Sequence, residues 1–473
     1  MARILMVSSE AAPYAKTGGL SDVLGALPQA LVARGEEVAV LIPHYRGMPI
    51  NTSVRVAYGG LRIELGSFTH EVDILETSAG GVTFYFADSP PLYNREGLYG
   101  DAGRDHHDNH IRFAVLDRTA LALARYVFRP DVIHCHDWQA GLVPLYLRDT
   151  FRGDPTFSGI KTLLTIHNLG YQGIFGAEIL ADVGIAAELF RPNVAEFYGN
   201  VNFLMAGMHF ADAINTVSRR YAEEIQTPEF GFHLDGFLRA NRGKLSGILN
   251  GVDYSRWSPE TDPHIARNYS AEDLTGKSVC KRALMAEFGI PESRFDRPLI
   301  GIISRFAAQK GFDIVAGVAS ELEAEDISMV VLGSGDPATE GLFQTLAARN
   351  PGKFGVRIGY DDPLAHRIEA GADIFLMPSR YEPCGLNQIY SLRYGTVPLV
   401  RATGGLDDTI EEGTGFKFWS YASSDLLAAV RHACVAFKDR EGWTEMMRRG
   451  MSKDFSWKKS AGEYADLYRR LLA

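Results

Sequence analysis

The alternation of short apolar strands with helices is the feature that most constrains how this chain can fold. The alternation is most regular after Arg297, where helical stretches separate five apolar strand-like runs. These runs lie at 298–303, 328–333, 354–358, 373–377 and 396–400. Such a rhythm favours a parallel sheet covered by helices on both faces. The second half of the chain is therefore predicted to be a Rossmann-like α/β domain.

The first half begins with the same rhythm and then departs from it. A strand at 2–8, a glycine turn, a helix and a strand at 37–42 form one βαβ unit. Residues 54–87 contain β-branched and aromatic runs that predict inserted strands and hairpins, and residues 88–110 are loop-like. The α/β rhythm returns after 111–126, a helical stretch, and predicts a second Rossmann-like domain.

Four other stretches carry predictions of their own. Residues 174–200 are expected to be irregular, 201–210 helical, and the chain from about Ser424 helical to its end. The stretch 254–270 is polar and contains two prolines, so it is interpreted as the segment where the chain crosses between domains.

A repeated hexapeptide supports two related halves. T-G-G-L-S-D at 17–22 and T-G-G-L-D-D at 403–408 each follow a strand, although a Gly-Gly turn can also recur by chance. A chain of 473 residues exceeds one ordinary core. We expect an N-terminal domain at 1–247, completed by a C-terminal helix at 457–473, and a second domain at 248–456. The two domains are expected to face each other across a cleft.

Composition narrows the class of protein. The hydrophobic content of 46% and charged content of 22% are those of a globular protein, and the net charge of −10 argues against nucleic acid or an anionic membrane as a partner. The four cysteines form no C-x-x-C, so neither a disulfide framework nor a zinc finger is indicated. With no apolar run of about 18 residues and no targeting pattern, a cytoplasmic protein is expected.

The stretch 378–388, P-S-R-Y-E-P-C-G-L-N-Q, is the first candidate site. It follows an apolar strand and precedes a helical pattern, so Glu382, Cys384 and Gly385 are expected at the strand's carboxyl end, where open α/β sheets bind ligands. Amides at a helix start favour anions. The alternative is that Glu382 only caps the helix beside a proline turn.

Cations and glycines near other strand ends form a second group of candidates. Lys16, Gly18 and Gly19 make a glycine loop whose amides can approach a phosphate, and Arg305 and Lys310 are two cations five residues apart just past a strand. The alternatives are a plain βα turn for the first group and solvated surface cations for the second.

Each of the remaining candidate residues gives only a weak functional signal when it is considered alone. Tyr360 follows a strand and can stack on a base or lie in the core, and His167 can be a general base, a positioning residue or a structural histidine. His134 and His136 flank a cysteine but share one strand face, so a zinc site is disfavoured. The chain has no D-x-D, so no metal site is predicted and basic residues would neutralise a leaving phosphate.

Seven stretches in this order resemble the bacterial glycogen synthases and the related starch synthases, which are retaining glycosyltransferases of the two-Rossmann-domain (GT-B) type. They are 16–23 (K-T-G-G-L-S-D-V), 136–142 (H-D-W-Q-A-G-L), 167–173 (H-N-L-G-Y-Q-G), 250–253 (N-G-V-D), 304–311 (S-R-F-A-A-Q-K-G), 378–386 (P-S-R-Y-E-P-C-G-L) and 401–406 (R-A-T-G-G-L). Together they span most of the chain, and the first combined with the sixth is highly specific.

The resemblance implies transfer of glucose from ADP-glucose to the non-reducing end of an α-1,4-glucan, glycogen or a maltooligosaccharide, with retention and without a metal cofactor. It also implies that the domain at 1–247 binds the acceptor and the domain at 248–456 binds the nucleotide sugar. The residues that it assigns to the diphosphate are Lys16, Gly18, Gly19, Arg305 and Lys310. Tyr360 would stack on adenine, and the glucose would contact Glu382, Cys384, Gly385 and Leu386. The sugar or acceptor site would include Asp22, Asp137, Asn168 and Asn250, with His167 on the sugar face opposite the leaving group.

The resemblance leaves several points open. Many related transferases carry a second glutamate eight residues after the first, where this chain has Tyr390. No carboxylate is an evident nucleophile, so we favour front-face attack through an ion-pair-like transition state over double displacement. The rivals are a phosphorylase or sucrose synthase of the same architecture, and a non-catalytic nucleotide-sugar or glucan-binding protein. The sequence does not decide the oligomeric state.

Overall fold

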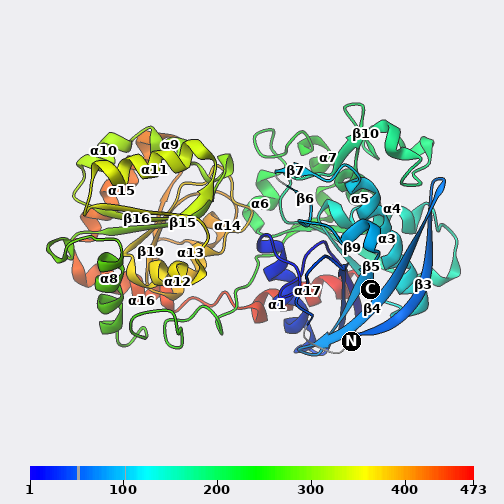
Figure 1. Ribbon diagram of the computed structural model, residues 1–473, viewed down its shortest axis with the longest axis horizontal. Coiled ribbons are helices and arrows are strands. Elements are labelled where there is room, and N and C mark those ends of the chain that lie inside the picture. Colours follow the sequence, from blue (N-terminus) through cyan, green and yellow to red (C-terminus); the bar gives the residue numbers. More distant parts are fainter. Residues whose placement is uncertain (51–53, 102) are drawn as a thin grey trace. The chain divides into compact units, whose positions relative to one another are not determined.

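The computed structural model describes residues 1–50, 54–101 and 103–473 and divides them into two compact α/β units (Figure 1). Unit 1 comprises Met1–Val217, Ala222–Gly251 and Trp457–Ala473, and unit 2 comprises Ser218–Tyr221 and Val252–Ser456. Residue 102, inside the loop expected at 88–110, lies outside the described residues. The chain therefore contributes its two ends to unit 1 and most of its second half to unit 2.

Unit 1 is built on a nine-stranded sheet in the order β14-β13-β9-β8-β1-β2-β5-β4-β3. Its strands are β1 (Arg3–Val7), β2 (Glu37–Pro43), β3 (Arg55–Leu65), β4 (Phe68–Ala79), β5 (Val82–Asp88), β8 (Val132–His136), β9 (Lys161–Ile166), β13 (Ala213–Thr216) and β14 (Leu245–Gly247). The strands from β14 to β5 pair in parallel, whereas β4 and β3 pair antiparallel. The strands and hairpin predicted within 54–87 are confirmed as an antiparallel extension of the parallel sheet.

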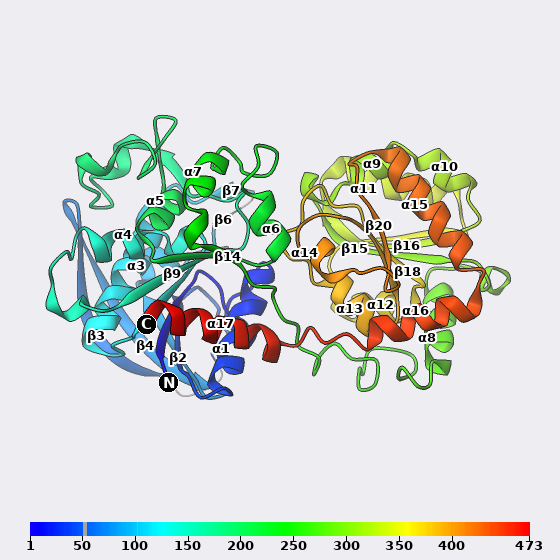
Figure 2. The ribbon, with the colours of Figure 1, turned by 180° about the vertical axis from the view of Figure 1, so that it is seen from behind.

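Helices cover both faces of this sheet, as expected when strands joined by right-handed crossovers run in both directions from β1 (Figures 1 and 2). The helices of unit 1 include α1 (Gly19–Val32), α2 (Pro90–Tyr93), α3 (Asn109–Tyr126), α4 (Leu142–Arg148), α5 (Phe203–Phe210), α7 (Asp235–Ala240) and α17 (Trp457–Leu472). The C-terminal α17 packs beside α1, and the hydroxyl of Tyr468 lies 2.8 Å from Nδ1 of His134 in β8. This contact ties the end of the chain to the centre of the first sheet.

Unit 2 contains a six-stranded, all-parallel sheet in the order β17-β16-β15-β18-β19-β20. Its strands are β15 (Leu299–Phe306), β16 (Ser328–Gly335), β17 (Phe354–Ile358), β18 (Ile374–Met377), β19 (Val397–Arg401) and β20 (Phe416–Phe418). The five strands predicted after Arg297 are confirmed within a few residues, and β20 is an addition. The doubly covered parallel sheet explains why these segments are continuously apolar.

Two layers of helices sandwich the second sheet, with α9, α10, α11 and α15 on one face and α8, α12, α13 and α16 on the other (Figures 1 and 2). The first layer consists of α9 (Phe312–Ala316), α10 (Ala319–Ala324), α11 (Pro337–Arg349) and α15 (Ser423–Ala436), and the second of α8 (Thr275–Glu287), α12 (Asp362–Gly371), α13 (Asn387–Arg393) and α16 (Arg440–Met451). Two further helices are α6 (Arg219–Glu224), which precedes these in the chain, and α14 (Gly404–Thr409). Separate apolar clusters fill the two interfaces.

Capping side chains explain where the observed helices differ from the predicted ones. The helix predicted at 201–210 begins two residues later because Asn202 caps α5 and accepts a hydrogen bond from the amide of Met205 at 2.9 Å. The helical C-terminus is divided because Asp439 caps α16, accepting from the Gly442 amide at 3.1 Å. The irregular region predicted at 174–200 contains β10 (Ile174–Gly176) and β11 (Glu196–Phe197), which pair with β12 (Asn200–Asn202).

Within the described residues, no helix combines the length and the apolar composition needed to cross a membrane.

Candidate active site

Glu382 lies in the loop between β18 and α13 and is buried. Its residue is 5% exposed, and its Oε2 accepts hydrogen bonds from Nζ of Lys310 at 2.6 Å and from Oγ of Ser379 at 3.0 Å. A buried carboxylate needs such a partner because unpaired charge is poorly solvated in the interior. The pair joins the carboxyl ends of β15 and β18, as the sequence predicted for ligand-binding residues.

The second glycine hexapeptide forms the floor of this loop. The amide of Gly405 donates to the carbonyl of Glu382 at 3.0 Å. A Cβ on Gly404, whose φ is +46°, would lie 2.0 Å from the Glu382 carbonyl oxygen, and a Cβ on Gly405 would lie 2.1 Å from that of Cys384. These distances are far below van der Waals contact, so the two glycines let α14 approach the backbone of the 382–385 loop.

Arg305 lies within the last residues of β15 and not past its end as predicted, because the strand continues to Phe306, whereas Lys310 follows the strand. The Lys310 side chain is 20% exposed, whereas Arg305 is exposed. Gly311 follows with φ +75°, and a Cβ there would lie 2.0 Å from the carbonyl oxygen of Pro378, so this turn packs directly on the loop that carries Glu382. The structure brings Lys310 to Glu382 and leaves Arg305 as an exposed cation at the same end of the strand.

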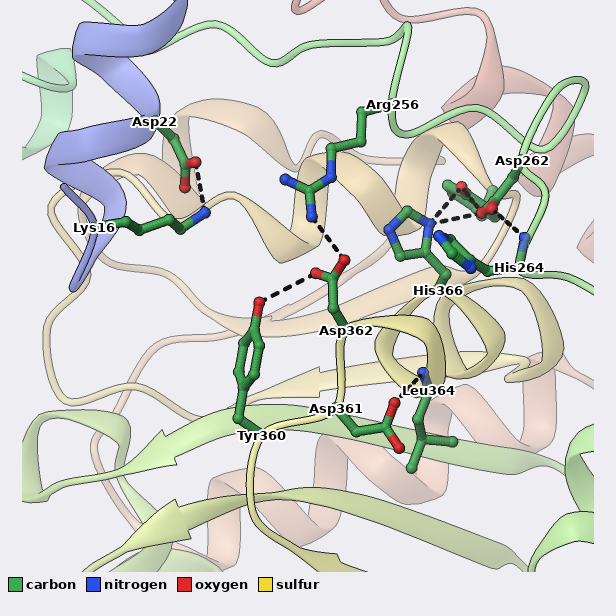
Figure 3. Close-up of polar contacts among 11 residues, drawn as sticks. Lys16, Asp22, Arg256, Asp262, His264, Tyr360, Asp361, Asp362, Leu364 and His366 are labelled. Atoms are coloured by element: carbon green, nitrogen blue, oxygen red, sulfur yellow. Dashed lines mark hydrogen bonds and ion pairs between the residues drawn. The ribbon is translucent and has the colours of Figure 1, made fainter. Parts of the chain in front are cut away.

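Tyr360 lies at the carboxyl end of β17, and 83% of its surface is exposed (Figure 3). Its hydroxyl donates to Oδ1 of Asp362 at 3.3 Å, and Oδ2 of Asp362 accepts from Arg256 at 2.6 Å. The Arg256 guanidinium contributes to holding the pKa of Asp362 below its usual value, against the effect of burial. The hydrogen bond thus holds the ring at its hydroxyl end, and an aromatic ring with this exposure can stack on a flat ligand.

Cys384, Gly385 and Leu386 continue the loop beyond Glu382. Cys384 is 5% exposed, and Gly385 has φ +70°, a left-handed conformation that favours glycine. Gln388 donates from Nε2 to the carbonyls of Cys384 and Gly385, both at 3.0 Å. These bonds from α13 fix the loop and so hold the backbone that the resemblance assigns to glucose binding.

In unit 1, the side chain of Glu10 fixes the loop of the first glycine hexapeptide (17–22) through hydrogen bonds. Its Oε2 accepts from the Thr17 amide at 2.5 Å and the Gly18 amide at 3.3 Å, and its Oε1 accepts from the hydroxyls of Thr17 at 2.6 Å and Tyr99 at 2.5 Å. Cβ atoms added to Gly18 and Gly19 would meet no described heavy atom within 4 Å. The front of this loop is therefore open, in contrast to its counterpart at 403–408.

Lys16 and Asp22 pair across the start of α1, with Nζ and Oδ1 2.6 Å apart (Figure 3). The side chains are 43% and 35% exposed. An exposed pair of this kind contributes little to stability because water solvates both charges. The ammonium of Lys16 can consequently exchange this partner for an anionic ligand at small cost.

Asp137 and His167 meet where β8 and β9 end. Oδ1 of Asp137 accepts from the His167 amide at 2.7 Å. Burial raises the pKa of Asp137 to about 7, despite hydrogen bonds from the backbone of His167 and Asn168, and burial lowers the pKa of His167 to about 3. Asp137 has φ +57°, an uncommon conformation for a residue with a side chain, and such strain clusters at functional sites.

Two asparagines complete the predicted residues of unit 1. Asn168 accepts from the Gly170 amide at 2.9 Å and shapes the turn after β9. Asn250 is 6% exposed, and among the described residues its Oδ1 has no hydrogen-bond partner. Buried polar atoms are nearly always paired, so this oxygen is available to a hydroxyl donor.

The sequence did not reveal the residues whose side chains hydrogen-bond to the predicted site residues, or to the partners of those residues, and so hold them in place. Glu10 and Ser379 both follow strands, which was the available signal, but their partners lie at other positions in the fold. Tyr99 comes from the loop-like stretch at 88–110. Arg256 comes from the polar stretch at 254–270, which was assigned only to the connection between domains. No group of three or more histidine, cysteine or acidic side chains in the described parts of the chain could hold a metal ion.

Two α/β units built on mainly parallel sheets, with polar side chains near the carboxyl ends of the strands, form the fold of a two-domain glycosyltransferase of the GT-B type. The family model described as starch synthase catalytic domain matches residues 3–240, and the model described as glycosyl transferases group 1 matches residues 286–447. The chain belongs to the glycogen synthase family, whose reaction is glucosyl transfer to a growing glucan.

The similarity covers whole proteins. The chain is 50% identical to glycogen synthase of Koribacter versatilis (strain Ellin345), over 99% of this chain and 98% of that protein. It is 48% identical to glycogen synthase of Anaeromyxobacter dehalogenans (strain 2CP-C), over 99% of both. The catalytic domain of starch synthase IV from Arabidopsis thaliana, bound to ADP and acarbose, superposes with a TM-score of 0.90 at 31% identity, covering 100% of this chain and 99% of that one.

Proposed function

We propose that this protein extends glycogen by transferring glucose from ADP-glucose to the non-reducing end of an α-1,4-glucan, with retention of the anomeric configuration. The observation that carries the proposal is the Lys310–Glu382 pair, 2.6 Å from nitrogen to oxygen, beside the exposed Arg305. This arrangement offers cations for a diphosphate and a carboxylate for sugar hydroxyls in one place. The similar starch synthase IV structure contains ADP and acarbose, a nucleotide and a sugar ligand of that protein.

The donor roles follow from the chemistry of each side chain. Arg305 and Lys310 neutralise the diphosphate, and Tyr360 stacks on adenine through its exposed ring. Glu382, with the backbone at Cys384–Leu386, binds the glucose hydroxyls. Lys310 donates a hydrogen bond to Glu382, so the ammonium that would bind the diphosphate also contacts the carboxylate that would bind the sugar.

The residues of unit 1 act on the same donor sugar and on the acceptor. Lys16 and the open amides at Gly18 and Gly19 add positive potential for the diphosphate. His167 lies on the sugar face opposite the leaving group. Asp22, Asp137, Asn168 and Asn250 bind sugar or acceptor hydroxyls, and the unpaired Oδ1 of Asn250 suits a hydroxyl donor.

The reaction proceeds by front-face attack. The bond from the anomeric carbon to the diphosphate oxygen breaks, and its electron pair leaves with ADP. The acceptor's 4-hydroxyl oxygen then bonds to the same face of that carbon, and its proton passes to the departing phosphate oxygen. Arg305 and Lys310 stabilise the developing negative charge, so the chemistry requires no metal cofactor. The carbonyl of His167 stabilises the positive charge on the sugar.

Glucose incorporation into glycogen tests the proposal. Labelled ADP-glucose and UDP-glucose are supplied in parallel, each with and without EDTA. We expect faster incorporation from ADP-glucose and the same rate with EDTA. Faster incorporation from UDP-glucose would contradict the proposed donor, and loss of activity with EDTA would contradict the metal-free mechanism.

The proposed location is the cytoplasm. All four cysteines are free thiols, and three of them are buried, which fits a reducing compartment. Separating cytoplasmic and membrane fractions of the producing cell and measuring transferase activity in each tests this placement.

A further inference from the structure

A second histidine touches His167 from the interior of unit 1. His136 is the last residue of β8, and His167 directly follows the neighbouring parallel strand β9. Nδ1 of His136 lies 2.9 Å from Nε2 of His167, and the ring centroids are 5.2 Å apart. His136 is fully buried. The two imidazoles are therefore joined by one hydrogen bond whose inner partner is shielded from water.

Both rings in this bond are neutral. Burial lowers the pKa of His167 to about 3 and, together with the neighbouring histidines, holds the pKa of His136 well below its usual value. A hydrogen bond between two neutral imidazoles needs an N–H on one nitrogen and a lone pair on the other. Only two arrangements satisfy this: either His136 donates from Nδ1, or His167 donates from Nε2.

The far nitrogen of His136 distinguishes these arrangements. Its Nε2 is buried and has no hydrogen-bond partner among residues 1–50, 54–101 and 103–473. If His167 donated, Nε2 of His136 would carry the ring proton and leave a buried N–H unpaired, which is rarer and less favourable than an unpaired acceptor. If His136 donates, Nε2 holds only a lone pair. The second arrangement is favoured, and it puts the proton of His167 on Nδ1.

The His136 ring is held in this orientation by the residue behind it. The ring of His134 packs against it at a centroid distance of 4.0 Å. His134 is itself fixed by Tyr468 at Nδ1, 2.8 Å away, and by Thr165 at Nε2, 2.5 Å away. Because both ring nitrogens of His134 are hydrogen-bonded, its ring is held in one orientation and packs against the ring of His136.

We propose that His136 is a positioning residue that holds His167 as the Nδ1–H tautomer, so that His167 presents a hydrogen-bond donor to an oxygen of the donor sugar. The inference rests on the proposed function, since it takes His167 to face the sugar. Without His136, the His167 ring can exchange tautomers and rotate, and the productive arrangement becomes one of several.

The test compares His136→Leu with His136→Asn. Leucine removes the donor, whereas the asparagine amide can supply an N–H near the position of Nδ1. We expect kcat to fall about 10- to 100-fold in His136→Leu, with the KM for ADP-glucose within about twofold, and His136→Asn to recover most of the loss. Equal losses in both variants, or an unchanged kcat in His136→Leu, would overturn the proposal.

Nitrogen-15 NMR of the histidine side chains gives a readout independent of activity, and its deciding result comes from the wild-type protein. The His167 signals are assigned by their loss in His167→Gln. The wild-type protein should show the proton of His167 on Nδ1, and His136→Leu should show a mixture of tautomers. A wild-type His167 protonated on Nε2 would refute the inference even if transfer is observed. A wild-type protein with the Nδ1 proton but no transfer would instead refute the proposed function.

Discussion

Replacing Gly405 with alanine is predicted to destabilise unit 2. The added Cβ would lie 2.1 Å, 2.5 Å and 2.6 Å from the carbonyl oxygen, Cα and carbonyl carbon of Cys384. These are backbone atoms of the loop that carries Glu382, so the clash cannot be relieved by a side-chain rotation. Overpacking costs about 1–3 kcal/mol in general, and a backbone clash belongs at the upper end of that range. For a unit of about 200 residues, the melting temperature should fall by roughly 4–10 °C.

Gly19→Ala is the matched control from the other copy of the hexapeptide. Its Cβ would meet no described heavy atom within 4 Å, and alanine is the better helix former at the start of α1. The melting temperature should therefore stay the same or rise slightly. The methyl group would project in front of the loop proposed to approach the diphosphate, so kcat/KM for ADP-glucose should fall by about tenfold or more.

Scanning calorimetry and initial rates measured on the same preparations separate the two effects. The account requires Gly405→Ala to lose stability and Gly19→Ala to lose activity while remaining folded. A Gly405→Ala melting temperature within about 1 °C of the wild type would refute the packing argument. An unchanged kcat/KM in Gly19→Ala would refute the role assigned to the open loop.

Three further predictions concern single side chains. Lys310→Met should lower kcat/KM by about 10²–10³-fold because it removes a cation from the diphosphate and takes the cationic partner from the buried Glu382. Steady-state kinetics on a variant with a preserved circular dichroism spectrum would check this. Tyr360→Ala should raise the KM for ADP-glucose about tenfold with little change in kcat, whereas Tyr360→Phe, which keeps the ring, should stay within about threefold; equal effects would contradict stacking. Burial raises the pKa of Glu369 to about 8, so the native state retains its proton above the unfolded pKa and stability falls as pH rises from about 4.3 through 8. Glu369→Gln should therefore gain melting temperature over the wild type at pH 8 but not at pH 5, and a gain independent of pH would contradict this.

The order of the elements could be predicted because each follows from local sequence. Continuous apolar runs bounded by glycine or proline gave the parallel strands, and the β-branched run at 82–86 gave β5. The hexapeptides at 17–22 and 403–408 were predicted as two related glycine turns. In the structure the first is open in front, whereas the glycines of the second let α14 pack on the loop at Glu382, a difference set by contacts about 20 residues away in the chain.

The supporting contacts of the site could not be predicted because they join distant segments. Glu10 meets Tyr99 across 89 positions, and Lys310 meets Glu382 across 72. Local pattern fixes neither pairing, although the topology of a parallel sheet explains why strand ends gather such residues. The contact of His136 with His167 depends likewise on β8 and β9 being neighbours, which residue spacing alone does not reveal.

The most direct test of the account is the structure of the bond that the protein makes. The protein is incubated with ADP-glucose labelled with carbon-13 at C1 and with a maltooligosaccharide, and the product is examined by NMR. The account predicts one labelled glucosyl residue after another at the non-reducing end, each joined through an α-1,4 bond. A labelled β-linked product would contradict retention, and label found only in free glucose or unreacted donor would contradict glucan extension.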